Sequence, residues 1–203
     1  MKRLTFFIPV LFTLMSVFPL STKAQTHNLS KEELVAFKED VGQMIDRFQN
    51  LLSILGSKDQ SKIVKETYKK QTLKLFMGEG KPYTDKYGNE KRAVHMQVSS
   101  LTQATRNIPM KEYLDRLVGL PYAKVQITQA ETYHLGELKQ VGEHYETTAT
   151  VFQKFCGWNA DGRKVYCDTT AKYIRIYLIP DEDFYGKKWI VKFGDVDVLE
   201  TTE

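Results

Sequence analysis

The sequence predicts an α+β fold in which N-terminal helices pack on an antiparallel sheet of four to five strands. Apolar residues recur at three- and four-residue steps between Leu34 and Leu55, as on the buried face of a long helix. Later segments instead alternate apolar and polar residues, and Asp161-Gly162 marks a tight turn between two of them. Helical patterns therefore come first, strand patterns follow, and no repeat or linker separates them.

The first 24 residues are typical of a signal peptide. Lys2 and Arg3 precede an apolar stretch over residues 4–20, and small residues at Thr22 and Ala24 fit a cleavage site. We expect cleavage after Ala24, leaving residues 25–203 as a single exported domain, periplasmic or extracellular. An uncleaved membrane anchor is the alternative, and no later stretch is apolar enough to span a membrane.

The net charge gives no indication of a nucleic-acid partner. The formal charge of +4 includes Lys2, Arg3 and Lys23, all of which the predicted cleavage removes. A mature chain this close to neutral lacks the excess of cations that nucleic-acid binding needs.

The expected helices follow from capping and breaking residues. Ser30 and Glu33 form a capping box, and the long apolar pattern ends at Gly56. A weaker apolar pattern predicts a second helix at residues 57–76, and Pro109 begins a short third helix over residues 109–117. Between them, residues 83–91 are expected to form a loop or the tip of a short hairpin.

Alternating residues place the strands. The sequence predicts strands in meander order, separated by loops or turns at residues 102–107, 135–143 and 180–187. Gly194 lies where the apolar parity of the last strand changes, which predicts a β-bulge. The expected strands are residues 93–101, 122–133, the two arms of a hairpin over 145–179, and 189–199.

A two-residue type I′ turn at Asp161-Gly162 fixes the register of this hairpin. The second arm would then place three apolar residues on the inner face, each opposite a residue of the first arm. The expected pairs are Ile174 with Ala149, Ile176 with Thr147, and Leu178 with Tyr145.

The same register places Cys156 opposite Cys167. Two cysteines in an exported protein favour a disulfide. A strict two-residue turn would put them at a hydrogen-bonded pair, where Cα atoms are farther apart, so two buried free thiols are the alternative.

The whole pattern resembles the nuclear-transport-factor-2-like (NTF2-like), or cystatin-like, superfold, with its long capped helix, shorter helix and long bent strands. The segments 168–172 and 189–195 are also similar to small exported proteins of Bacteroidetes bacteria, mostly uncharacterised. The resemblance implies a curved sheet that forms a cone with the helix, and an open end that often holds a ligand. Some members are isomerases or dehydratases, and others only bind or dimerise.

Polar residues on the inner face predict a ligand pocket near the turn of the hairpin. In the register above, Asp168, Thr170 and Lys172 continue the apolar inner strip, and Gln153 and Phe155 face Thr170 and Asp168. A polar cluster at the end of an apolar strip is typical of a pocket mouth. The alternative is that sheet curvature brings this end into solvent.

Catalytic and metal chemistry have weaker support. Asp168 as a general base would need a raised pKa, and Lys172 is expected to pair with it and keep it ionised. The histidines lie far apart in the sequence, and we expect neither metal nor cofactor.

We therefore predict an exported, non-catalytic binding protein for an unidentified small ligand or protein, which could form a homodimer. The alternatives are a small-molecule lyase or isomerase and a protein–protein interaction module that uses an aromatic sheet face at Tyr173 and Tyr177.

Overall fold

A computed structural model describes residues 29–85, 87–101, 103–181 and 189–202. The predicted signal peptide, residues 1–24, lies outside this range, as does most of the expected turn at 180–187. Among the described residues, no helix combines the length and the apolar character that crossing a membrane requires.

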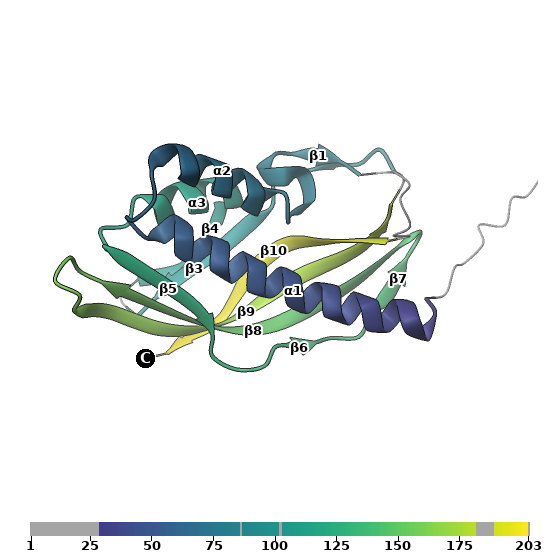
Figure 1. Ribbon diagram of the computed structural model, residues 1–203. Coiled ribbons are helices and arrows are strands. Elements are labelled where there is room, and N and C mark those ends of the chain that lie inside the picture. The colour runs from purple at the N-terminus through teal and green to yellow at the C-terminus, as the bar shows by residue number, and fades with distance from the viewer. Residues whose placement is uncertain (1–28, 86, 102, 182–188, 203) are drawn as a thin grey trace, which may run out of the picture.

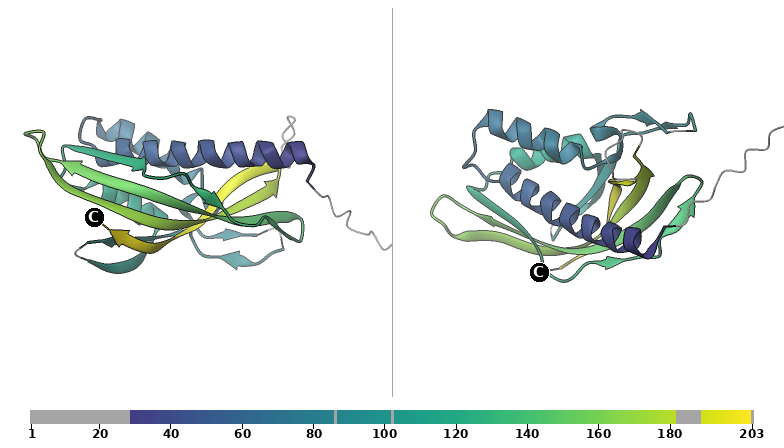
Figure 2. Two further views of the ribbon diagram at one scale, coloured as in Figure 1. Left: turned by 90° about the horizontal axis from the view of Figure 1, so that it is seen from below. Right: turned by 45° about the vertical axis from the view of Figure 1, so that its right-hand side comes forward.

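Three α-helices cover one face of a strongly curved sheet, which confirms the predicted α+β class (Figure 1). Both views in Figure 2 show the helices on the same side of the sheet. The arrangement is the one that the NTF2-like resemblance implies. The helices are α1 (Lys31–Gly56), α2 (Lys62–Leu73) and α3 (Met110–Val118), with a short 3-10 turn, η1 (Met77–Gly80), after α2.

The helix boundaries follow their capping residues. The capping box is formed on both sides, since Ser30 Oγ accepts from Glu33 N and Glu33 Oε2 accepts from Ser30 N. The second helix is shorter than predicted because Ser61 is its N-cap and accepts from Val64 N.

Within the described residues, eight strands form one sheet, more than the four or five predicted. Their order is β4-β3-β10-β9-β8-β5, with β6 and β7 also paired to β8. The strands are β3 (His95–Ser100), β4 (Gln103–Pro109), β5 (Lys124–Gln129), β6 (His134–Leu135), β7 (Lys139–Val141), β8 (His144–Trp158), β9 (Lys164–Pro180) and β10 (Trp189–Thr202).

Two sequence-based expectations for the sheet are wrong, and a third holds only in part. Residues 102–107 are not a loop, because most of them belong to β4, which pairs with β3. The connection at 135–143 contains β7, and β6 extends into its start. The meander order holds for β5, β8, β9 and β10, which are neighbours in that sequence, but β3 pairs in parallel with β10 and not with β5. Such long-range pairings leave no local sequence signal.

The predicted hairpin register is correct and Asp161 and Gly162 lie in its turn, although the predicted two-residue type I′ geometry is wrong. Tyr145 faces Leu178 and Cys156 faces Cys167. The loop, however, has three residues, with Gly162 N bonded to Asn159 O and Gly162 at φ 76°. A bulge at Val165 compensates for the extra loop residue, because Gly157 faces Tyr166 while Trp158 faces Lys164.

The predicted bulge at Gly194 is also present. Phe193 faces Ile176 and Val196 faces Ile174, so β10 carries one extra residue between them. A side chain at Gly194 would collide with Tyr177. The carboxylate of Asp195 accepts from His95 N and Arg92, which ties β10 to the start of β3.

The hydrophobic core lies between α1 and the inner face of the sheet. Phe48, Phe76 and Phe193 pack edge to face at its centre, with ring centroids 5.2 to 6.1 Å apart. Serine hydroxyls at the end of α1 bond the backbone of β5: the Oγ of Ser57, the C-cap, accepts from Val125 N at 2.9 Å, and Ser53 Oγ accepts from Ile127 N at 2.8 Å. The helix thereby satisfies backbone groups on the free edge of β5.

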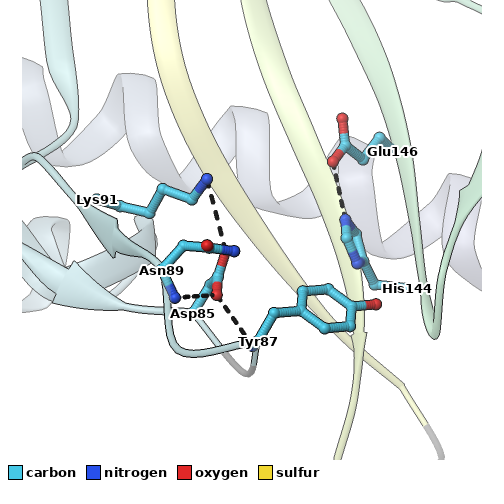
Figure 3. A network of polar contacts seen from close by, with 6 residues as sticks. All are labelled: Asp85, Tyr87, Asn89, Lys91, His144 and Glu146. Atoms are coloured by element: carbon cyan, nitrogen blue, oxygen red, sulfur yellow. Dashed lines mark hydrogen bonds and ion pairs between the residues drawn. The ribbon is translucent and has the colours of Figure 1, made fainter.

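A small separate hairpin covers one end of the sheet. It consists of β1 (Tyr83–Thr84) and β2 (Glu90–Lys91), as the hairpin alternative predicts. Figure 3 shows the Tyr87 ring at its tip projecting toward His144 at the start of β8. The Tyr87 hydroxyl accepts from Glu143 N at 3.3 Å, and His144 contacts Glu146 at 2.8 Å.

Candidate functional site

A cavity of about 430 Å³ lies between α3, the β3–β4 hairpin and the turn-proximal half of β8 and β9. All five predicted site residues line it, together with residues of α3 and of the β3–β4 hairpin. The five predicted residues are Gln153, Phe155, Asp168, Thr170 and Lys172.

The register explains why these side chains share one cavity. Asp168, Thr170 and Lys172 alternate along β9, and Gln153 and Phe155 face two of them from β8. Gln153, Asp168, Thr170 and Lys172 are buried and Phe155 is half-buried. The alternative that sheet curvature exposes this end to solvent is therefore wrong.

The two buried charges have separate partners. Lys172 Nζ donates to Gln153 Oε1 at 2.7 Å, and the Tyr166 hydroxyl donates to Asp168 Oδ2 at 2.5 Å. The expectation that Lys172 pairs with Asp168 is wrong: among the described residues no ion pair joins them. They lie four residues apart on the strand, with Thr170 between them.

Burial shifts the pKa of each group in the direction that favours its neutral form. Desolvation lowers the pKa of Lys172 to about 8, and the attraction of Asp168 offsets this only in part. Desolvation also raises the pKa of Asp168, although the Tyr166 hydrogen bond and Lys172 oppose it. The pKa of Tyr166 rises to about 12, first because of burial and then because it donates to Asp168.

The walls contain residues that the sequence interpretation did not select. Tyr113 of α3 and Tyr122 after it lie on one side, and burial raises the pKa of both phenols. Phe155 packs between Tyr122 and Tyr166, with ring centroids 6.0 and 5.9 Å away. Other lining residues include the apolar Ile108, Leu117 and Leu120, the basic Arg106 and Arg116, and the hydroxyl-bearing Ser99 and Ser100. Only Tyr166 carried a signal, because it lies two residues before Asp168 on the same face of β9.

A disulfide joins Cys156 and Cys167 directly behind this site, as predicted. Their Cα atoms are 4.1 Å apart, nearer the spacing of a non-hydrogen-bonded pair than the wider pair expected from a two-residue turn. The alternative of two free thiols is therefore wrong. The two residues lie on the outer face, between the Phe155–Asp168 and Gly157–Tyr166 pairs.

Other surfaces fit a ligand less well. A second hollow of about 500 Å³ lies along the β1–β2 hairpin, but none of its lining residues is buried. In the described part of the chain, no group of three or more His, Cys, Asp or Glu side chains could hold a metal ion. On the outer face Tyr173 is 40% exposed, whereas Tyr177 is half-buried beside Gly194.

No family model matches the chain, and no curated protein matches it significantly. Solved structures with a similar arrangement include a candidate scytalone dehydratase from Novosphingobium aromaticivorans (9% identity, TM-score 0.44), which aligns over 85% of this chain and 91% of its own. Proteins from Catenulispora acidiphila (12%, 0.40, over 83% and 94%) and Kribbella flavida (10%, 0.37, over 81% and 90%) are also similar. These similarities are too low to carry an argument about activity or ligand, and the resemblance to Bacteroidetes proteins stays a prediction.

Proposed function

We propose that the protein binds a small molecule in this cavity and releases it unchanged. The observation that carries the proposal is that four buried polar residues line one cavity of about 430 Å³: Gln153, Asp168, Thr170 and Lys172. Ligand sites of roughly 300–1,000 Å³ typically combine apolar walls with a few converging polar groups.

The lining suggests a ligand with an apolar body and polar ends. The aromatic rings of Tyr113, Tyr122 and Phe155 offer the apolar contact. Lys172 and Asp168 lie on either side of Thr170 along the strand and would bind separate polar groups.

We also propose that this binding takes place after export. The N-terminal pattern predicts a mature protein, residues 25–203, that begins at Gln25 and forms one domain. The Cys156–Cys167 disulfide is compatible with an oxidising compartment outside the cytoplasm. N-terminal sequencing of protein from the cell envelope would test this, and an intact Met1 with membrane retention would contradict it.

A proton-transferring lyase or isomerase is the second candidate. Asp168 favours it, since its pKa is raised by burial and its carboxylate accepts a hydrogen bond from Tyr166 inside a cavity. Turnover of a ligand once identified, with loss of rate in Asp168→Asn, would establish this function instead.

A protein–protein module has less support, because Tyr177 is half-buried and does not extend the exposed ring of Tyr173 into a flat aromatic face. Homodimer formation stays a prediction, which sedimentation of the mature protein would test.

Native mass spectrometry of protein purified from its own host would test the binding proposal. We expect a retained compound in the wild type and its loss in Ala104→Trp, because the exposed Ala104 lines the cavity. Thr105→Trp is the matched control, since Thr105 is an exposed neighbour outside the lining. Equal retention by the two variants would contradict binding in this cavity.

A further inference from the structure

Lys172 is a buried amine that lines the cavity. Its side chain is 8% exposed and its Nζ has a neutral partner, the amide oxygen of Gln153 at 2.7 Å. Within the described part of the chain, no carboxylate lies within ion-pair distance of this amine. A buried lysine without a carboxylate partner gains little from staying charged.

The lowered pKa of Lys172 makes it more reactive than an ordinary lysine. Burial lowers its pKa to about 8, so about a tenth of the amine is neutral at pH 7, far more than for a lysine of ordinary pKa. The neutral amine is the nucleophilic form, and lysines in desolvated pockets react with carbonyl compounds for this reason.

The rest of the cavity suits a carbonyl compound with an apolar body. Tyr122 and Phe155 provide aromatic surface, and the Asp168 carboxylate can accept a hydrogen bond from a hydroxyl or amine at the far end of the ligand.

We propose that Lys172 captures a small aldehyde or ketone in this cavity as a reversible imine. The inference rests on the proposed function, since it names the ligand class of the same site. The Nζ lone pair attacks the carbonyl carbon, the C=O π electrons move to oxygen, and a proton passes from nitrogen through water to that oxygen, which gives a carbinolamine. Its hydroxyl takes a second proton from solvent and leaves as water while the nitrogen lone pair forms the C=N bond, and the nitrogen then returns a proton to solvent. No redox co-reactant is needed.

A second buried lysine, Lys65, shows whether burial alone or a place in the cavity makes a lysine reactive. Lys65 is 7% exposed, its pKa is also lowered by burial, and its Nζ donates to Leu55 O at 3.1 Å. It does not line the cavity. If burial alone made a lysine reactive, Lys65 would react as Lys172 does.

Reductive trapping with benzaldehyde tests the proposal. Sodium cyanoborohydride reduces the imine to a stable benzylamine, which peptide mass mapping assigns to a residue. At pH 7 we expect Lys172 to be labelled at least about tenfold faster than Lys65 or any exposed lysine, because those amines are less often neutral or less accessible.

The cavity variants and the wild-type map together decide the outcome. We expect labelling of Lys172 to fall in Ala104→Trp, to persist in Thr105→Trp and to vanish in Lys172→Arg. Labelling of Lys172 no faster than exposed lysines, or equal labelling in the two Trp variants, would overturn the proposal. The wild-type map decides even if Lys172→Arg does not fold. If the protein retains a host compound but Lys172 is not labelled preferentially, this inference is wrong and the proposed function stands.

Discussion

Lys172 and Gln153 are diagonal neighbours on β9 and β8, and the lysine ammonium donates to the glutamine amide oxygen at 2.7 Å. The amide can stabilise the ammonium but adds no negative charge, so burial still lowers the pKa of Lys172.

This arrangement predicts a pH-dependent stability. Below about pH 8, Lys172 is charged in both states and its burial destabilises the folded protein. Between about 8 and 10.5 the unfolded chain holds more protons, so the free energy of unfolding rises with pH. The rise should total about 3 kcal/mol in the wild type relative to Lys172→Met. Urea denaturation of both proteins across this range measures it, and parallel curves would contradict the buried charge.

Asp168 should have the opposite dependence. Because its pKa is raised, the folded state holds more protons than the unfolded state between pH 3.8 and the folded pKa. The free energy of unfolding therefore falls with pH across that range, and the ionised carboxylate destabilises the protein above it. Asp168→Asn keeps an acceptor for Tyr166 and removes the charge. We expect this variant to gain thermal stability over wild type at pH 7 and less or none at pH 3. A gain independent of pH would point to packing and not to the charge.

The sequence reveals one wall of the candidate site and not the other. Alternation and Asp161-Gly162 place Gln153, Asp168 and Lys172 on one face, because strand parity is a local property. The predicted register holds because the three-residue loop and the bulge at Val165 cancel, which no local rule anticipates.

The opposite wall depends on contacts between distant segments. Tyr113 and Tyr122 reach the cavity only because the β3–β4 hairpin joins the last strand and α3 packs beside it. The pairing of Lys172 with Gln153, and of Asp168 with Tyr166, likewise depends on side-chain geometry that spacing does not determine.

Ser57 should be important for stability although it is far from the cavity. Its hydroxyl is buried and bonds Val125 N and O at 2.9 and 3.1 Å. Ser57→Ala would leave these buried backbone groups without that partner, at a cost of about 1–3 kcal/mol. Chemical denaturation measures the loss, with Thr67→Ala as control, because the exposed Thr67 hydroxyl bonds only within its helix. An equal loss of unfolding free energy in the two variants would show that the Val125 backbone finds another hydrogen-bond partner.

The disulfide should stabilise the turn end of the hairpin. Cys156 and Cys167 are 11 residues apart, so the chain-entropy account predicts a loss of about 3 kcal/mol in Cys156→Ser/Cys167→Ser. We expect this variant to fold, to melt at a lower temperature and to lose ligand retention before its secondary structure. Circular dichroism and native mass spectrometry over one temperature series give both readings. Unchanged retention up to the melting temperature would show that the clamp does not support the site.

A crystal structure of the protein purified from its own host tests small-molecule binding most directly. We predict density for a non-protein compound between Lys172 and Asp168, in contact with Tyr122 or Phe155. A compound bound instead on the outer face at Tyr173, or a cavity holding only water in protein that retains a compound by mass spectrometry, would contradict the account.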